Sequence, residues 1–376
     1  MIAHSPLDRP MEIVELEDER GTAALARWLA QFARADDVIV LGGELGAGKT
    51  AFARAFLREA TGDPELETPS PTFTIVQSYE GREFPLVHAD FYRLRGPEDL
   101  VQIGWSETIR GAVALVEWGE RAAAALPADH LDLTLEFDAG RGPDYRLALF
   151  RPRGPSMLAR FTLARAVEAL LERAGWAEAR RELMYGDAST RAYERLTNAA
   201  GQTAILMIAP PRAPGAPLRF GKSYAEIARL SFDIRAYLAM SEGLRAEGVS
   251  IPRVYAHSVA DGLALIEDFG TETIADATGA NASRYAEAAA LLADVHTRIL
   301  PSELPFDGEL YTLPGYDLEA MLIEVELALD WYAPAVARGA PSSGARIQFL
   351  TLWRDIVSPV LAEPVAAVER EPEPVA

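Results

Sequence analysis

A glycine-rich segment near the start of the chain has residue types that suit phosphate binding. Residues 43–50 read GELGAGKT and fill the pattern G-x-x-x-x-G-K-[ST] completely. In such a loop the backbone N–H groups point at phosphate oxygens, Lys49 reaches the β and γ phosphates of a nucleotide, and the Thr50 hydroxyl ligates Mg²⁺. The predicted ATP-binding residues are Gly43, Glu44, Leu45, Gly46, Ala47, Gly48, Lys49 and Thr50.

Lysine is rare in this chain, which supports a functional role for the lysine in the glycine-rich segment. Of 36 basic residues only Lys49 and Lys222 are lysine, and the others are arginine. A compact ammonium and a planar guanidinium are not interchangeable, so the chemistry of the ammonium is a reason for a lysine to be retained here. Lys222 lies in a Gly-Lys-Ser loop and is expected to be solvated.

Two carboxylates follow apolar runs that are predicted to be strands. Asp90 follows PLVHA and Glu117 follows AVALV. In open α/β sheets ligands bind at the carboxyl ends of the strands, so both side chains are candidates to hold a metal or orient water. The catalytic candidates are therefore Lys49, Asp90 and Glu117, and the metal candidates are Thr50, Asp90 and Glu117. A solvated residue at a strand exit is an equally open interpretation of each carboxylate.

These residues need a sheet to position them, and the first 150 residues alternate between strand and helix patterns. Helices are predicted at Thr22–Ala35 and Thr50–Thr61, the second directly after the glycine-rich segment. A buried parallel strand is predicted from Asp37, because β-branched residues run continuously there and end at glycine. Further strands are predicted at 11–16, 72–79, 85–90, 112–118, 130–137 and 145–150. The fold class is α/β, with a mainly parallel sheet covered on both faces and an antiparallel pair at its end.

A domain boundary is predicted at residues 151–157, where two prolines and a glycine interrupt the pattern. The predicted organisation is a domain at 1–150, this linker, a second α+β domain at 158–365 and an acidic tail at 366–376. In the second domain, helices are predicted at 157–176, 283–299 and 317–332, and strands at 193–196, 203–208 and 263–267.

Composition excludes several classes of protein. The chain has 376 residues, enough for two domains, and no cysteine, so disulfide frameworks and thiolate metal sites are excluded. No apolar run reaches the length of about 20 residues that crosses a bilayer, so no membrane association and a cytoplasmic location are expected. The formal net charge of −20 disfavours long-range attraction of the chain alone to nucleic acid.

Four motifs together resemble those of the TsaE (YjeE) family. They are GGELGAGKT at residues 42–50, SPTFT at 70–74, HADFYR at 88–93 and Glu117-Trp118, in the order and approximate spacing of that family. The resemblance covers about residues 11–150. It implies a P-loop NTPase fold and the ATPase subunit of the bacterial machinery that makes threonylcarbamoyladenosine at position 37 of tRNA.

The resemblance also implies partners and further residues of the site. The partners are the TsaB and TsaD proteins, with tRNA contacted indirectly through the complex. Carried over by motif, Lys49 and Thr50 hold phosphate and Mg²⁺, and Asp90 and Glu117 are the metal or water carboxylates. Residues 70–74 resemble a switch segment near the γ-phosphate. Trp118 either lies beside the site or packs in the core, and His88 is expected to be a buried structural histidine.

The second domain resembles the N-terminal part of the aminoglycoside phosphotransferase superfamily, in particular its cell-wall sugar kinases. Residues 186–196 are similar to the nucleotide-covering hairpin, residues 265–270 to the hinge strand and residues 291–296 to the helix before the catalytic lobe. Asp187 and Ser189 would touch a nucleotide there, although a plain hairpin turn is favoured. The catalytic motif H-x-D-x-x-x-x-N does not occur in this sequence, so an incomplete, inactive kinase-like region is expected.

Two other functions stay open on the sequence alone. The first is a small-molecule kinase acting on a sugar such as N-acetylmuramic acid, with the N-terminal domain as a passenger. The second is a scaffold that binds nucleotide without turning it over.

Overall fold

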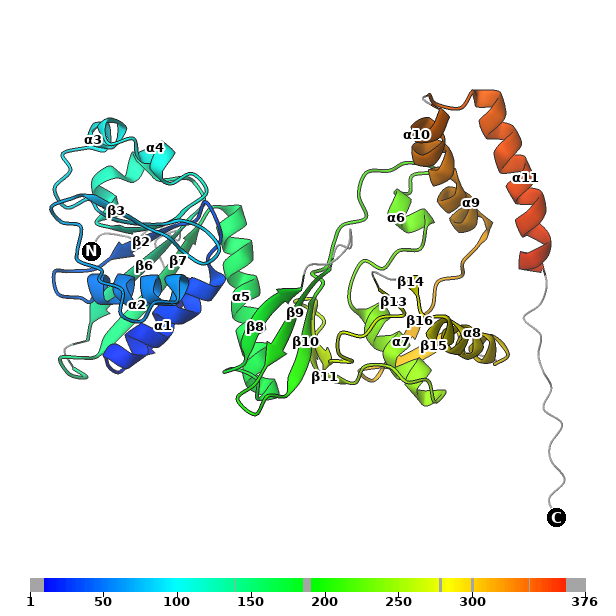
Figure 1. Cartoon of the computed structure of the whole chain (residues 1–376), viewed down its shortest axis with the longest axis horizontal. Helices are drawn as coiled ribbons and strands as arrows, with labels where there is room; N and C mark the ends of the chain where they lie inside the picture. Colours follow the sequence, from blue (N-terminus) through cyan, green and yellow to red (C-terminus); the bar gives the residue numbers. More distant parts are fainter. Residues whose placement is uncertain are drawn as a thin grey trace, which may run out of the picture. The chain divides into compact units, whose positions relative to one another are not determined.

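The computed structural model describes residues 10–138, 140–184, 191–276, 279–298, 301–337 and 339–362. Contacts between residues divide the chain into two compact units, residues 1–165 and 166–376. Each unit is described by itself (Figure 1).

The first unit is built on a seven-stranded sheet with the order β1-β7-β6-β2-β5-β4-β3. Strands β6, β2, β5 and β4 are parallel, β7 and β1 add antiparallel strands at one edge, and β3 adds one at the other. The predicted mainly parallel α/β sheet is therefore confirmed. The strands are β1 (Glu12–Leu16), β2 (Val38–Gly42), β3 (Val76–Tyr79), β4 (Leu86–Asp90), β5 (Val113–Glu117), β6 (His130–Phe137) and β7 (Arg146–Arg153).

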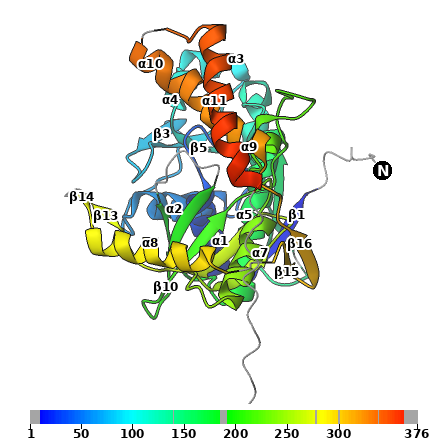
Figure 2. The ribbon, with the colours of Figure 1, turned by 90° about the vertical axis from the view of Figure 1, so that its right-hand side faces the viewer.

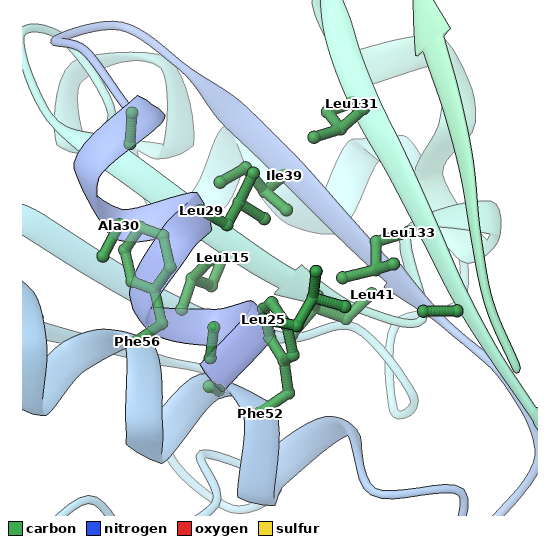
Figure 3. Close-up of a cluster of buried hydrophobic side chains, with 14 of the residues drawn as sticks. Leu25, Leu29, Ala30, Ile39, Leu41, Phe52, Phe56, Leu115, Leu131 and Leu133 are labelled. Carbon is green, nitrogen blue, oxygen red and sulfur yellow. The ribbon is translucent and has the colours of Figure 1, made fainter. Parts of the chain in front are cut away.

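Helices cover both faces of this sheet because its central strands are apolar on both sides. On one face α1 (Glu19–Phe32) and α2 (Lys49–Thr61) pack against side chains such as Leu115, and Figure 3 shows this core. On the other face Ala114 and Val116, which flank Leu115 on β5, belong to a second core. The short helices that follow β4 and β5 are α3 (Pro97–Gln102), α4 (Trp105–Thr108) and the 3₁₀ segment η2 (Gly119–Ala125).

Helix α5 (Pro155–Ala174) begins in the first unit and ends in the second. Its first turns belong to the first unit, where Phe161 is buried in the core and Arg160 forms an ion pair with Asp37 at 2.6 Å. Residues 151–157, predicted as a linker, form the end of β7 and the start of α5, because β7 pairs with β6 as far as Arg153.

One predicted strand is shorter in the structure. The pattern at 72–79 predicts a strand over its whole length, but β3 begins at Val76. Before it the chain turns, since the Ile75 N–H donates to the Pro71 carbonyl at 2.6 Å and Ile75 has a φ of 66°. The alternation of apolar and polar residues does not reveal such a turn.

The second unit contains a five-stranded antiparallel sheet with the order β11-β12-β10-β9-β8. Its strands are β8 (Arg180–Met184), β9 (Ala192–Thr197), β10 (Thr203–Ile208), β11 (Val254–Ser258) and β12 (Leu263–Glu267). The sequence predicts β9, β10 and β12, but β8 and β11 have little apolar alternation and are missed. Two small antiparallel strand pairs follow, β13 (Ala275–Asp276) with β14 (Gly279–Ala280), and β15 (Glu303–Phe306) with β16 (Glu309–Thr312).

The helices of the second unit leave much apolar surface exposed. They are α6 (Tyr224–Ile227), α7 (Arg235–Ala246), α8 (Ala282–His296), α9 (Leu318–Leu327), the π-helical η3 (Ala328–Tyr332), α10 (Ala333–Ala337) and α11 (Ser343–Ala362). Helix α7 packs in the core with the sheet, and α9 and α11 lie side by side (Figure 2). No side chain of α8 is buried, and Leu352 and Ile356 of α11 are exposed. Residues 187 and 189 and the predicted tail lie outside the described residues.

Phe56 tests the core between α2 and the sheet, where its side chain is fully buried. We expect Phe56→Ala to reduce the stability of the first unit by about 3–5 kcal/mol, because it removes apolar contacts and leaves a cavity. Hydrogen exchange of α2 amides measures the change in this unit alone. Phe73→Ala is the matched control, since Phe73 is 86% exposed; equal losses in the two variants would contradict the packing described.

Candidate active site

The glycine-rich segment forms the loop between β2 and α2, as its sequence predicts. Gly43, Gly46 and Gly48 have φ values of 125°, 81° and 109°, which side chains other than glycine rarely adopt. A Cβ atom on Gly43 would lie 2.3 Å from the Leu135 carbonyl oxygen of β6. The loop can therefore follow this path only with glycine at its first position.

Lys49 is folded back onto the loop that precedes it. Its Nζ donates to the carbonyl oxygens of Gly43 at 2.7 Å and Glu44 at 3.0 Å, and it lies 4.3 Å from the centre of the Trp118 ring. Only 5% of the residue is exposed. Burial lowers the pKa of Lys49 below its usual 10.5, while the carboxylates of Glu117, Glu120 and Asp90 oppose that shift.

Thr50, Glu117 and His88 form a hydrogen-bonded chain from the loop into the sheet. The Thr50 hydroxyl donates to Glu117 Oε1 at 3.0 Å, and the same oxygen lies 3.0 Å from His88 Nε2. A carboxylate can only accept, so His88 carries a hydrogen on Nε2. His88 is fully buried on β4, as expected, and its contact is with a candidate site residue.

Asp90 lies beside Glu117 but has different partners. The two residues are in register on the parallel strands β4 and β5. Asp90 Oδ2 accepts from the Thr72 hydroxyl at 2.8 Å, and Oδ1 accepts from the Tyr92 N–H at 2.9 Å. The Ser70 hydroxyl lies 2.8 Å from that of Thr72. The segment at 70–74 is therefore hydrogen-bonded to Asp90, one of the two candidate carboxylates.

Trp118 combines the two roles that the sequence left open. Its ring packs partly against the second core, and it also lies beside Lys49. Tyr92 packs next to Trp118, with the two ring centres 5.2 Å apart. Trp118 has a φ of 60°, so the backbone turns sharply as it leaves β5.

Comparison with known proteins places the first part of the chain in a family. The model of the family described as "Threonylcarbamoyl adenosine biosynthesis protein TsaE" matches residues 16–142. The protein of this name from Rickettsia felis is 36% identical over 121 residues, which cover 32% of this chain and 70% of that protein. The one from Bacillus subtilis is 38% identical over 116 residues, 31% of this chain and 71% of that protein. The chain belongs to the TsaE family.

A different relative matches the rest of the chain. The N-acetylmuramate/N-acetylglucosamine kinase of Caulobacter vibrioides is 35% identical over 178 residues, which cover 44% of this chain. The chain spans about half of that kinase, 49% of its length. The resemblance of the second unit to a sugar kinase, stated from its sequence, agrees with this match.

The TsaE region offers Mg²⁺ few protein ligands. Among the residues that the structure describes, no group of three or more His, Cys, Asp or Glu side chains is placed to hold a metal. Mg²⁺ usually keeps several waters and takes one or two carboxylates together with substrate phosphates. The adjacent Thr50 hydroxyl and Glu117 carboxylate fit that mode of binding.

Arg146 supports the loop and was missed from the sequence. Its Nε donates to the Ala47 carbonyl at 3.1 Å, and its guanidinium lies 4.0 Å from the centre of the Phe137 ring. Arg146 lies on β7, almost 100 residues after the loop, and no local pattern links the two. Only the antiparallel pairing of β7 with β6, next to β2, brings it there.

The described residues include no helix long and apolar enough to cross a membrane.

The buried ammonium of Lys49 gives stability a dependence on pH. Its pKa is lowered in the folded state, so between that value and 10.5 the unfolded chain binds more protons and stability rises with pH. We expect wild type to gain stability relative to Lys49→Met as the pH rises toward 10.5 without nucleotide. Thermal unfolding of both proteins across this range measures it, with Lys222→Met as control for loss of a lysine. Parallel curves for wild type and Lys49→Met would rule out the effect.

Proposed function

We propose that this TsaE-family chain is the ATPase subunit that supports threonylcarbamoyladenosine formation at position 37 of tRNA. It binds ATP and Mg²⁺ at the loop of residues 43–50 and acts in the cytoplasm with TsaB and TsaD. One observation carries the proposal: a complete phosphate-binding loop whose Thr50 is hydrogen-bonded to Glu117, a carboxylate at the carboxyl end of the neighbouring strand. The TsaE names of its relatives support the pathway.

The loop supplies positive charge where phosphates carry negative charge. Its glycines allow backbone N–H groups to face phosphate oxygens, and the N-terminus of α2 adds a partial positive charge. Lys49 leaves the carbonyl oxygens of Gly43 and Glu44 to contact the β and γ phosphates. That exchange costs little solvation energy, since the ammonium is already largely removed from water.

The two carboxylates take separate roles in this proposal. Glu117 holds the Thr50 hydroxyl in place. Together the two groups would hold Mg²⁺, which would supply positive charge to neutralise the β and γ phosphates. Asp90 is bonded to Thr72, so it couples the segment at 70–74 to the site and is the better placed of the two to orient a water. His88 fixes the Glu117 carboxylate from the other side.

The partners also explain how an acidic chain serves an RNA-modifying pathway. With a net charge of −20 the chain does not attract tRNA over long range, and the TsaB and TsaD proteins hold it close to that substrate. ATP hydrolysis then supports repeated rounds of modification by TsaD.

Replacing Lys49 tests the site. We expect Lys49→Ala to reduce ATP turnover by at least about 100-fold, with or without TsaB and TsaD, because it removes the ammonium proposed to neutralise the γ-phosphate. Turnover is measured by phosphate release, and Lys49→Arg tests whether a charge without ammonium geometry is sufficient. Turnover that Lys49→Ala leaves unchanged would remove the basis for the assignment.

Comparing Glu117→Gln with Asp90→Asn separates the two carboxylates. We expect Glu117→Gln to raise the Mg²⁺ concentration needed for half-maximal turnover by about tenfold or more, because it removes the charge beside Thr50. Asp90→Asn should lower maximal turnover and leave the Mg²⁺ requirement near that of wild type. Mg²⁺ titrations of ATP hydrolysis measure both, and the opposite pattern would reverse the roles.

For the second unit we propose a kinase-derived region without phosphotransferase activity in this chain. The relative from Caulobacter vibrioides favours a sugar-kinase origin, whereas the sequence has no H-x-D-x-x-x-x-N motif to orient the attacking hydroxyl. Incubation with ATP and N-acetylmuramic acid should give no sugar phosphate. Sugar phosphate formed by Lys49→Ala would show that the second unit is an active kinase.

A further inference from the structure

The loop of residues 43–50 is held to the sheet by Arg146, a residue that lies outside the family match. The family model matches residues 16–142, whereas Arg146 is on β7. Strands β7, β6 and β2 are neighbours in the sheet (Figure 1), so the side chain extends to the loop that follows β2. Its Nε donates to the carbonyl of Ala47, a loop residue that is only 1% exposed. This hydrogen bond fixes the direction of one carbonyl group of the loop.

The guanidinium of Arg146 is itself held by the end of its own strand pair. Its Nη1 donates to the carbonyl oxygens of Pro143 at 2.6 Å and Tyr145 at 2.8 Å. Phe137, which is opposite Arg146 in the pairing of β6 with β7, supplies the ring that packs against the guanidinium. These contacts restrict the side chain, so Nε is already in place as a donor to the Ala47 carbonyl.

The bond to Ala47 also determines where the next N–H points. The peptide between Ala47 and Gly48 is planar and trans, so its C=O and its N–H point in opposite directions. Because the carbonyl is directed at Arg146, the Gly48 N–H points away from that side chain. No carbonyl oxygen of the residues that the structure describes accepts a hydrogen bond from this N–H. Gly48 is the N-cap of α2, where such N–H groups bind anions.

Glycine at position 48 allows this peptide to rotate unless another group holds it. Gly48 has a φ of 109°, and glycine adopts negative φ values as readily. Rotation would turn the Ala47 carbonyl oxygen toward bound phosphates, where two negative oxygens would repel each other. A side chain that binds this carbonyl from the opposite direction therefore favours the peptide orientation that suits phosphate.

We propose that Arg146 is a positioning residue for nucleotide binding, which holds the peptide between Ala47 and Gly48 with its N–H toward the phosphates of ATP or ADP. Arg146 does this through its hydrogen bond to the loop, and its charge is secondary. The inference rests on the proposed function, since it takes the loop of residues 43–50 as the nucleotide site.

Three substitutions of Arg146 separate the hydrogen bond from the charge. Arg146→Met has a methyl group in place of Nε and loses both. Arg146→Gln has an amide N–H at the same number of bonds from the backbone, so it keeps a donor there and loses the charge. Arg146→Lys keeps the charge but has a methylene group at that position.

The test measures the affinity of the full chain for ADP and for ATP with Mg²⁺ by titration calorimetry. We expect Arg146→Met and Arg146→Lys to weaken binding of both nucleotides about tenfold, because the loop N–H groups contact phosphates that ADP and ATP share. Arg146→Gln should bind both within about threefold of wild type. In ATP turnover, Arg146→Met should raise KM more than it lowers kcat. A folding defect would instead lower apparent kcat, because it reduces the amount of active protein.

Arg153→Met is the matched control, because it breaks an ion pair with Asp132 on the same strand and leaves the loop contact in place. Its nucleotide affinity should stay near that of wild type. If Arg146→Met does not fold, the comparison of Arg146→Gln with Arg146→Lys decides. Three results would overturn the inference alone: wild-type affinity in Arg146→Met, tighter binding by Arg146→Lys than by Arg146→Gln, or equal weakening by Arg153→Met. Wild type that binds no nucleotide would overturn the proposed function, and this inference with it.

Discussion

The hydrogen bond between Thr50 and Glu117 joins the phosphate-binding loop to the sheet, and the rest of the site depends on it. Thr50 is on the first turn of α2, directly after the loop. Glu117 is the last residue of β5, which pairs in parallel with β2, the strand that leads into the loop. Parallel pairing of β2 and β5 therefore decides that a hydroxyl and a carboxylate meet at one edge. His88 on the next strand fixes that carboxylate from behind, so three elements share one point of contact.

The site also buries a charged group, the ammonium of Lys49, at a cost in stability. The loop carbonyls and the Trp118 ring make up for only part of the hydration that this ammonium loses on burial. A loop whose hydrogen-bond donors were all paired within the protein would leave few donors for a phosphate. The buried lysine is thus consistent with a site in which stability is given up for function.

The sequence predicts the part of the site that is local in the chain. Residues 43–50 form one motif, and the apolar runs before Asp90 and Glu117 are continuous enough to be recognised as buried strands. Contacts made across the sheet are not predicted in this way. The bond from Arg146 to Ala47 and the bond from Thr72 to Asp90 depend on strand order and on an unforeseen turn. Family resemblance indicates which segments come together at the site, but not which atoms form the hydrogen bonds between them.

The measurement that tests the central claim most directly is a double-mutant cycle on ATP affinity in the presence of Mg²⁺, with Thr50→Val, Glu117→Gln and the double variant. If the hydroxyl and the carboxylate act as one unit at the nucleotide, the two losses are not additive, and the coupling energy is about 1 kcal/mol or more. Losses that add within about 0.3 kcal/mol, or single variants that bind ATP as tightly as wild type, would contradict it.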